Sequence, residues 1–304
     1  MPGAGVCACC GQTSVATRVL DVASTDTADR FTIERCGACG VLRTSPVPAD
    51  LAPYYATDLA GTMTQPGARL FSTLRRLQLA RELRHITHHG HPGTVVDVGC
   101  GTGDFARVLA RRGIPIVAAD AGPRPPAALA AARIPYVRFD FERYELQDLP
   151  IPGPYTVILR HVLEHVRDPQ ACLANLRRQG ARQFYLVVPN AGSLERRLLG
   201  AHWYLWDPPR HLWHFDGRTL AQVCERAGLV TIGRGVGTAP VLLPSLYRRL
   251  RLGGWPPALY ERFGPTTLLT ALAAPVSLLV PGNVLWCVAR ALTPRSSTPP
   301  PTAS

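Results

Sequence analysis

A glycine-rich turn between two differently patterned segments constrains the fold of this chain more than any other feature. Thr94–Val98 (TVVDV) has the β-branched residues of a buried strand, and Gly99–Gly103 (GCGTG) forms a tight loop. Asp104–Arg112 then has helical spacing, and Ile114–Ala119 reads as a second strand. This order of strand, glycine loop, helix and strand predicts one half of a doubly wound α/β sheet that binds a ligand at the loop.

The spacing of the glycines argues against a phosphate at this loop. The dinucleotide fingerprint GxGxxG would need a third glycine where the chain has Asp104, and a carboxylate there would repel a pyrophosphate. A P-loop is excluded because no Gly-Lys-Ser/Thr follows the glycines. Asp120 ends the next strand, 21 positions after Gly99, where an acid can accept hydrogen bonds from a ribose.

Two CxxC pairs stand out in the first forty residues. They lie in Cys7–Gly11 (CACCG) and Cys36–Gly40 (CGACG), with 25 residues between the pairs. Two such turns complete a tetrahedral Cys₄ zinc site, with Thr17–Val22 and Arg30–Glu34 as strands of a zinc ribbon and Cys9 as a spare thiol. The expected ligands of a structural Zn²⁺ ion are Cys7, Cys10, Cys36 and Cys39. A redox dithiol, or buried cysteines that never meet, are the alternatives.

The motifs that follow the glycine loop resemble those of class I S-adenosylmethionine-dependent methyltransferases. VVDVGCGTGDFARVLARRG, the strand-ending Asp120, Asp140 in VRFDFE, HVLEHVRDP and VVPN occur in that family's order within about 93–235. The resemblance implies a Rossmann-like α/β fold with a seven-stranded sheet and S-adenosylmethionine as cofactor. The later strands would be Tyr155–Leu159, Phe184–Val188, Val230–Val236 and Asn283–Ala289.

The resemblance also implies which residues bind the cofactor. Asp97 and the loop glycines would cradle the methionine part, Asp120 would take the ribose hydroxyls, and Asp140 with Phe141 would lie at the adenine. The full expected set is Asp97, Gly99, Cys100, Gly101, Gly103, Asp120, Ala121, Asp140, Phe141 and Arg160. The chain departs from the family at Thr156, where an Asp is usual, and in RRQGARQ, which replaces a glycine-rich turn.

The segment after the fourth expected strand carries the expected catalytic groups. His161–His165 (HVLEH) projects from the carboxyl edge of the sheet, where ligands bind. Methyl transfer from a sulfonium requires an aligned nucleophile and removal of its proton, so Glu164 and His165 offer a base with an orienting or metal-binding partner. Similar quinone-type O-methyltransferases have an acid at the position of His161, which makes a magnesium site less convincing here. Alternatively, His161 and His165 cap the helix and lock the loop.

Ala201–Phe215 (AHWYLWDPPRHLWHF) is dense in aromatic residues and histidine. In the similar family this position forms the lip over the acceptor site. Trp203, Trp206 and Trp213 would stack on a sugar or an aromatic acceptor, with His211 as a general base. The alternative is an aromatic plug that packs against the edge of the sheet.

Composition narrows the choice of partners and compartment. The net charge is +12, but all 33 basic residues of the 304 are arginine, which indicates coding bias more than a nucleic-acid surface. No run of about 18 apolar residues predicts a transmembrane helix. No secretory signal is recognised, and nine cysteines without export indicate reduced thiols, so a cytoplasmic location is expected.

The sequence also suggests an organisation into parts. The expected parts are a zinc ribbon at 1–45, a linker and capping helix at 46–92, a methyltransferase domain at 93–293 with cap insertions at 191–215 and 237–281, and a disordered tail at 294–304. The capping helix is expected at Arg69–Ile86, and the four histidines that begin at His85 are assigned to a solvated linker. Residues 247–280, basic and then apolar, form either a cap over the acceptor or a peripheral contact with an anionic membrane.

These features together predict a methyltransferase that transfers a methyl group to O or C of a small-molecule or glycan acceptor, such as a sugar, a polysaccharide or a secondary metabolite. An rRNA-type methyltransferase that grips RNA through the ribbon is one alternative. A non-catalytic cofactor-binding scaffold is another.

Overall fold

The computed structural model describes residues 5–24, 27–55, 79, 82–91, 93–147, 151, 153–239, 241, 245, 248 and 282–292. The expected tail at 294–304, most of the expected helix Arg69–Ile86 and nearly all of 247–280 lie outside these described residues. Within the described part, no helix has the length and apolar character that crossing a bilayer requires.

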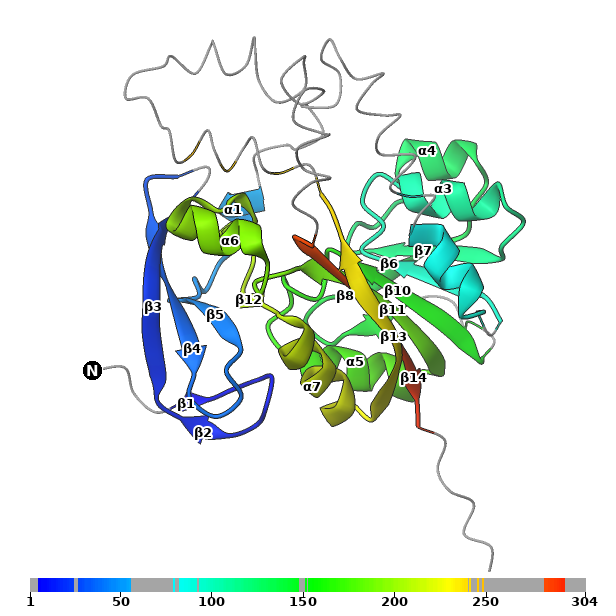
Figure 1. The fold of residues 1–304 in the computed structure, drawn as a ribbon. Helices are drawn as coiled ribbons and strands as arrows, with labels where there is room; N and C mark the ends of the chain where they lie inside the picture. The colour runs from blue at the N-terminus through cyan, green and yellow to red at the C-terminus, as the bar shows by residue number, and fades with distance from the viewer. Residues whose placement is uncertain are drawn as a thin grey trace, which may run out of the picture.

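The larger part of the structure is a twisted sheet flanked by helices (Figure 1). Its strands lie in the order β13-β14-β11-β10-β6-β7-β8-β9. They are β6 Val95–Val98, β7 Ile116–Asp120, β8 Tyr136–Asp140, β9 Glu145–Leu146, β10 Tyr155–Arg160, β11 Ala181–Pro189, β13 Leu229–Gly237 and β14 Val284–Ala291. The five strands from β11 to β8 are parallel, whereas β14 runs antiparallel to both of its neighbours. This is the predicted Rossmann-like class I methyltransferase fold, with the two-residue β9 added at one edge.

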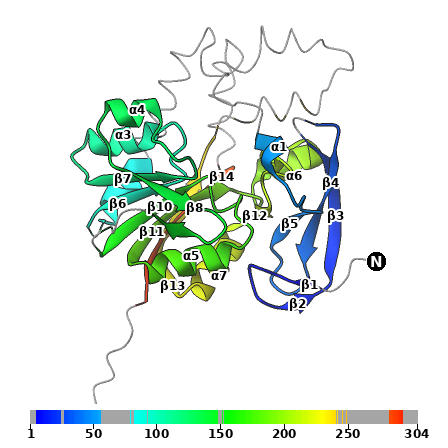
Figure 2. The ribbon, with the colours of Figure 1, turned by 180° about the vertical axis from the view of Figure 1, so that it is seen from behind.

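Helices cover both faces of this sheet (Figure 2). One face packs against α3 Asp104–Ala110, α4 Ala127–Ala131 and the helical residues 82–88, and the other against α5 Pro169–Arg178 and α7 Gly217–Arg226. The first five residues of the central β10 are buried, as expected for a parallel strand covered on both sides. Asp168 caps α5: its carboxylate accepts a hydrogen bond from the Ala171 N–H at 2.8 Å, so the loop that follows β10 ends at a fixed point.

The N-terminal part forms a second, antiparallel sheet in the order β12-β5-β4-β3. Its strands are β3 Ala16–Ala23, β4 Arg30–Cys36, β5 Leu42–Ser45 and β12 Trp213–His214, beside the short hairpin of β1 Gly5–Val6 and β2 Thr13–Ser14. The sequence predicted β3 and β4 but neither β5 nor β12. Because β12 belongs to the segment after β11, the two parts of the chain share one hydrogen-bonded sheet.

The second sheet is covered by α6 and by the residues Ala201–Phe215, which we call the aromatic segment. α6 Leu194–Leu199, η2 Gly200–His202 and η3 Tyr204–Trp206 lie beside it (Figure 1). Trp203 and Trp206 are fully buried and share a core with Val22 and Ile33. This packing makes the expected stacking surface on these two indoles wrong. The indoles form a buried plug, but they cover the second sheet and not the edge of the main sheet, as the alternative had it.

His85, His88, His89 and His91 were predicted to lie in a solvated linker, and for His85 and His89 that prediction is wrong. Residues 82–88 are helical, and the His85 ring stacks on the Trp286 indole with 4.0 Å between ring centroids. A Cβ atom at Gly235 would lie 2.6 Å from this indole, and one at Gly233 would lie 2.4 Å from the His89 ring. Glycines on β13 therefore make room for aromatic packing that the local sequence does not announce.

We expect Gly103→Ala to destabilise the fold more than Gly113→Ala. Both residues have a left-handed backbone, with φ of 80° and 72°, which costs a non-glycine residue about 1 kcal/mol. A Cβ at Gly103 would also lie 2.4 Å from the Leu129 side chain, whereas one at Gly113 meets nothing within 4 Å. Overpacking should raise the loss for Gly103→Ala to about 2–4 kcal/mol, measured by urea unfolding. Equal losses for the two variants would contradict this account of the loop.

Candidate functional site

The glycine loop between β6 and α3 packs closely at one glycine and is open at another. A Cβ at Gly99 would lie 2.4 Å from the Val162 side chain, so the loop packs directly against the segment after β10. A Cβ at Gly101 would meet nothing within 4 Å, which leaves open space above the middle of the loop. The Gly101 N–H donates to the Asp120 carboxylate at 2.8 Å, and the other oxygen of this carboxylate accepts from the Ala121 N–H at 2.8 Å.

Asp97 is a buried acid with an unsatisfied oxygen. Its side chain lies at the end of β6, is 3% exposed, and its Oδ2 has no hydrogen-bond partner among the described residues. Burial raises the pKa of Asp97 to about 7. The nearby Arg160 guanidinium opposes this shift, but it also pairs with Glu82 and lies over the Phe105 ring. An orphaned carboxylate oxygen of this kind fits a cationic group on a ligand.

The other expected cofactor residues follow neighbouring strands. The Asp140 carboxylate at the end of β8 accepts hydrogen bonds from the Glu142 and Arg143 N–H groups at 2.8 and 3.0 Å, and the adjacent Phe141 ring packs edge-on against Phe139. Cys100 is 9% exposed, and burial raises the pKa of its thiol. The whole expected set therefore lies at or just beyond the carboxyl ends of β6, β7, β8 and β10. Their binding of a cofactor remains a prediction.

The segment after β10 brings a carboxylate and an imidazole together. His161 has a left-handed backbone, with φ of 56°, and its Nδ1–H faces the Glu164 Oε1 at 3.4 Å. Glu164 is fully buried, and its Oε2 has no partner in the described part of the chain. Burial alone would raise the pKa of Glu164, but the His161 hydrogen bond and the adjacent imidazoles lower it, so the group is a carboxylate at neutral pH.

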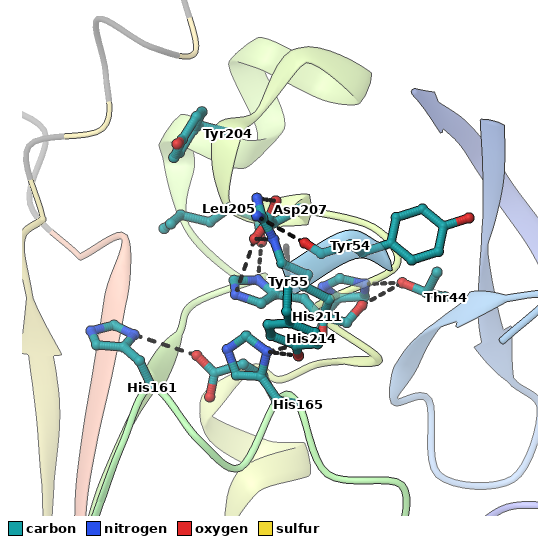
Figure 3. A network of polar contacts seen from close by, with 12 residues as sticks. Thr44, Tyr54, Tyr55, His161, His165, Tyr204, Leu205, Asp207, His211 and His214 are labelled. Atoms are coloured by element: carbon teal, nitrogen blue, oxygen red, sulfur yellow. Dashed lines mark hydrogen bonds and ion pairs between the residues drawn. The ribbon is translucent and has the colours of Figure 1, made fainter. Parts of the chain in front are cut away.

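His165 and His211 meet beside this carboxylate (Figure 3). Their rings are 4.7 Å apart between centroids and nearly perpendicular. The His165 Nδ1 lies 3.0 Å from the Arg210 carbonyl, and the His211 Nδ1 lies 2.9 Å from the Leu205 carbonyl. Since a carbonyl only accepts, Nδ1 carries the proton in both rings and Nε2 holds the lone pair. Burial lowers the pKa of His165 to about 4, so this imidazole is neutral at pH 7.

Trp213 does not offer a stacking surface either. It is 7% exposed, and its indole N–H donates to the Val166 carbonyl at 2.9 Å. The backbone N–H groups of Leu212 and Trp213 both donate to the Glu164 carbonyl. The aromatic segment thus positions His211 through backbone bonds to the segment after β10.

Three contributors to this site were not predicted from the sequence. The Tyr55 hydroxyl, on α1 Ala52–Tyr55, lies 3.0 Å from the His165 Nδ1. The Thr44 hydroxyl donates to the His211 carbonyl at 2.6 Å, and Asp207 holds Arg210 through two hydrogen bonds of 2.6 and 2.9 Å. The paired tyrosines in an otherwise Pro- and Ala-rich stretch were the only sequence signal for Tyr55, and they were assigned to a connector.

The N-terminal cysteines form a separate cluster. Sulfur atoms of Cys7 and Cys39 are 4.0 Å apart and those of Cys10 and Cys36 are 3.9 Å apart, close to the edge of about 3.8 Å that a tetrahedral Zn–S₄ site requires. The cluster leaves out Cys9. Hydrogen bonding from Cys9 lowers the pKa of Cys7 to about 4, whereas burial raises the pKa of Cys9 itself. The four sulfurs fit a small zinc site.

A parallel sheet with a glycine loop after its first strand and polar groups along its carboxyl edge defines a class I methyltransferase fold. A family model described as "Methyltransferase domain" matches residues 69–232, more than half of the chain. The chain belongs to this methyltransferase domain family.

Curated relatives carry the name ubiquinone biosynthesis O-methyltransferase. The protein of Cereibacter sphaeroides is 31% identical over an alignment of 151 positions, which covers 46% of this chain and 61% of the relative. That of Pectobacterium carotovorum is 33% identical over 127 residues, 38% of this chain and 52% of the relative. The chain therefore matches less than two thirds of these relatives' length. Among solved structures, 1,6-didemethyltoxoflavin-N1-methyltransferase of Burkholderia thailandensis has a TM-score of 0.46 and 14% identity, covering 91% of this chain and all of that one.

We expect Asp97→Asn to flatten the pH dependence of stability. The folded-state pKa of about 7 lies above the ordinary value of 3.8, so the folded protein holds this proton more tightly than the unfolded chain. Stability from this group is therefore present below pH 4 and is lost as the pH rises toward 7, by up to about 4 kcal/mol. Urea unfolding of the ligand-free protein between pH 4 and 8 should show this loss in the wild type and not in Asp97→Asn. Parallel pH profiles would contradict the assignment.

We also expect one zinc ion to depend on the four clustered cysteines. Cys36→Ser should lose this ion and loosen the second sheet, because structural zinc supplies folding free energy. Cys9→Ser is the matched control, since Cys9 is an adjacent buried thiol outside the cluster, and it should keep the ion. Elemental analysis measures the zinc, and loss of the ion in Cys9→Ser alone would reverse the ligand assignment.

Proposed function

We propose that this protein transfers a methyl group from S-adenosylmethionine to an oxygen or carbon atom of a small-molecule or glycan acceptor. The observation that carries the proposal is the contact between Gly99 and Val162. It joins the glycine loop, which has the features of a nucleoside-binding turn, to the segment that bears Glu164 and His165. A cofactor on the loop and an acceptor at these side chains would therefore be neighbours, as alignment for transfer requires.

The residues on the loop side suit this cofactor. The orphaned Asp97 oxygen would accept from the ammonium group of the methionine part, and the Asp120 carboxylate stands at the loop to accept from ribose hydroxyls. The open space at Gly101 lets a ligand approach the backbone. When bound, the cofactor supplies an electrophilic methyl group on a sulfonium.

The residues on the acceptor side suit proton removal. His165 and His211 each direct Nδ1–H to a backbone carbonyl and keep a lone pair on Nε2. An acceptor hydroxyl that donates to one of these nitrogens would be held and would lose its proton there as the methyl group transfers. The buried Glu164 carboxylate stabilises the resulting positive charge on the imidazole.

The relatives support a small-molecule acceptor. Their name, ubiquinone biosynthesis O-methyltransferase, assigns them an O-methyl transfer in ubiquinone biosynthesis. A sugar or the end of a glycan presents hydroxyl groups of the same reacting type, so we include both in the proposed acceptor class.

Calorimetric titration of the zinc-loaded protein with S-adenosylmethionine and S-adenosylhomocysteine tests the proposal. Both ligands should bind, and Asp120→Ala should weaken each by at least about 10-fold through loss of charge-assisted hydrogen bonds. Glu225→Gln, an exposed change on α7, is the control and should leave binding unchanged. Labelled methyl donor, offered with catechol and sugar panels, then identifies the acceptor. No binding by the wild type would favour the non-catalytic scaffold instead.

A further inference from the structure

A cavity between α7 and the strands β13 and β14 has a cysteine on its wall. We propose that this cysteine, Cys287, and the neighbouring Cys224 form a redox-active pair that a hydroperoxide converts reversibly into a disulfide. The helix α7 lies beside both strands (Figure 1), and the two thiols belong to the core that this helix shares with the main sheet. The pair is separate from the cysteine cluster and from the groups assigned to methyl transfer, so the inference does not rest on the proposed function.

The positions of the two thiols follow from the periodicity of the helix and the register of the strands. Cys224 comes four residues after Leu220 and three after Ala221, so these three side chains lie on one face of α7. Leu220 and Ala221 line the cavity together with Cys287. On the sheet side, Cys287 is paired with Arg234 in the ladder between β14 and β13. The helix therefore directs Cys224 toward the strand that carries Cys287, and the two thiols interact through a hydrogen bond.

The cavity gives a small oxidant access to one of the two thiols. Its volume is about 320 Å³, whereas a water molecule takes up about 30 Å³ in the liquid. Arg234 and Val236 line the cavity and are exposed, so it opens to solvent. Cys287 is 3% exposed and borders this space, whereas Cys224 is fully buried. A peroxide therefore meets Cys287 first.

The surroundings of Cys287 favour its thiolate. Hydrogen bonding from Cys224 lowers the pKa of Cys287, and this effect outweighs the opposing effect of burial. The Thr231 hydroxyl, 3.7 Å from the Cys287 sulfur, and the Arg234 guanidinium lower the pKa further. The same hydrogen bond, together with burial, raises the pKa of Cys224, so this thiol keeps its proton. The pair thus combines a nucleophilic thiolate with a protonated thiol that can resolve its oxidised form.

Two other buried thiols show how this environment differs from an inert one. Burial raises the pKa of both Cys100 and Cys172, and nearby aspartates add to the shift in each case. Near Cys287 the charged side chain that shifts the pKa is a cation, Arg234. Since the thiolate is the form that reacts with peroxides, Cys287 should be oxidised before Cys100 and Cys172.

The reaction is balanced with hydrogen peroxide as the oxidant. The Cys287 thiolate attacks one peroxide oxygen, an S–O bond forms, the O–O bond breaks and hydroxide leaves, which gives a sulfenic acid. The Cys224 sulfur then attacks the sulfenic sulfur, the S–O bond breaks, and hydroxide leaves with the Cys224 proton as water. Two electrons pass from the sulfurs to the peroxide. The sulfurs must approach to the disulfide bond length of about 2 Å, and the cavity leaves free space beside Cys287 for this movement.

Peptide mapping of the zinc-loaded, full-length protein tests the pair without relying on activity. After treatment with one equivalent of hydrogen peroxide and alkylation of free thiols, trypsin should release peptide 219–226 linked to peptide 263–290, because these carry Cys224 and Cys287 between arginine cleavage sites. Dithiothreitol should separate the two peptides. The linked protein should also melt at a higher temperature than the reduced protein, since the cross-link restricts the unfolded chain.

Variants assign the role of each thiol. Cys224→Ala should stop at the sulfenic acid on Cys287, which dimedone traps, whereas Cys287→Ala should leave Cys224 as a free thiol. Arg234→Gln changes an exposed residue and should slow the oxidation at least about 3-fold, which corresponds to a rise of about half a unit in the pKa of the Cys287 thiol. Cys172→Ala, at a fully buried thiol of α5, is the matched control and should form the link as the wild type does.

Three results would overturn the inference. One is a wild-type protein whose other thiols are oxidised by peroxide while Cys287 stays reduced. Another is a sulfenic acid on Cys287 of the wild type that does not proceed to the link with Cys224. The third is a link that forms only after the protein is unfolded in urea, because the native structure would then not bring the two sulfurs together.

Discussion

The residues expected to bind the cofactor depend on five parallel strands that end at one edge of a sheet. In such a sheet all strands point in the same direction. The loops that follow the strands therefore all start at the same edge, where the carboxyl ends lie. Asp97, Asp120, Asp140 and Arg160 come from four different strands and lie along one edge for this reason. Burial of the strands on both faces leaves that edge as the place where polar side chains can gather, and burial there raises the pKa of Asp97.

The second sheet is part of the same site. Its strand β5 pairs with β12, and Thr44 on β5 hydrogen-bonds both the His211 carbonyl and the His214 ring. Tyr55, a few residues further along the chain, reaches His165. The cysteine cluster lies in the same core as the main sheet and α7, so the N-terminal part is joined to the main sheet through packing as well as through hydrogen bonds.

Local patterns made a large part of this structure predictable. The β6–α3–β7 unit, β3, β4 and the cysteine cluster are each encoded in short runs whose periodicity or spacing has one straightforward interpretation. β5 was missed because LRTS is too short and polar to stand out, and β12 because it exists only as a partner of β5. Thr44 and His211 are 167 residues apart, and no periodic signal links them. The tryptophans were ambiguous for a similar reason, since an aromatic cluster reads alike whether it faces a ligand or a neighbouring sheet.

The pairing of β5 with β12 sets a lower limit on the piece of chain that can fold by itself. The family match at 69–232 includes β12, Trp203 and Trp206 but none of β3, β4 or β5. A fragment cut to that match would leave an unpaired strand edge and two large indoles without their cover, both of which promote aggregation. The recognisable domain is therefore smaller than the cooperative unit, and truncation to it would remove the scaffold that holds His211 in place.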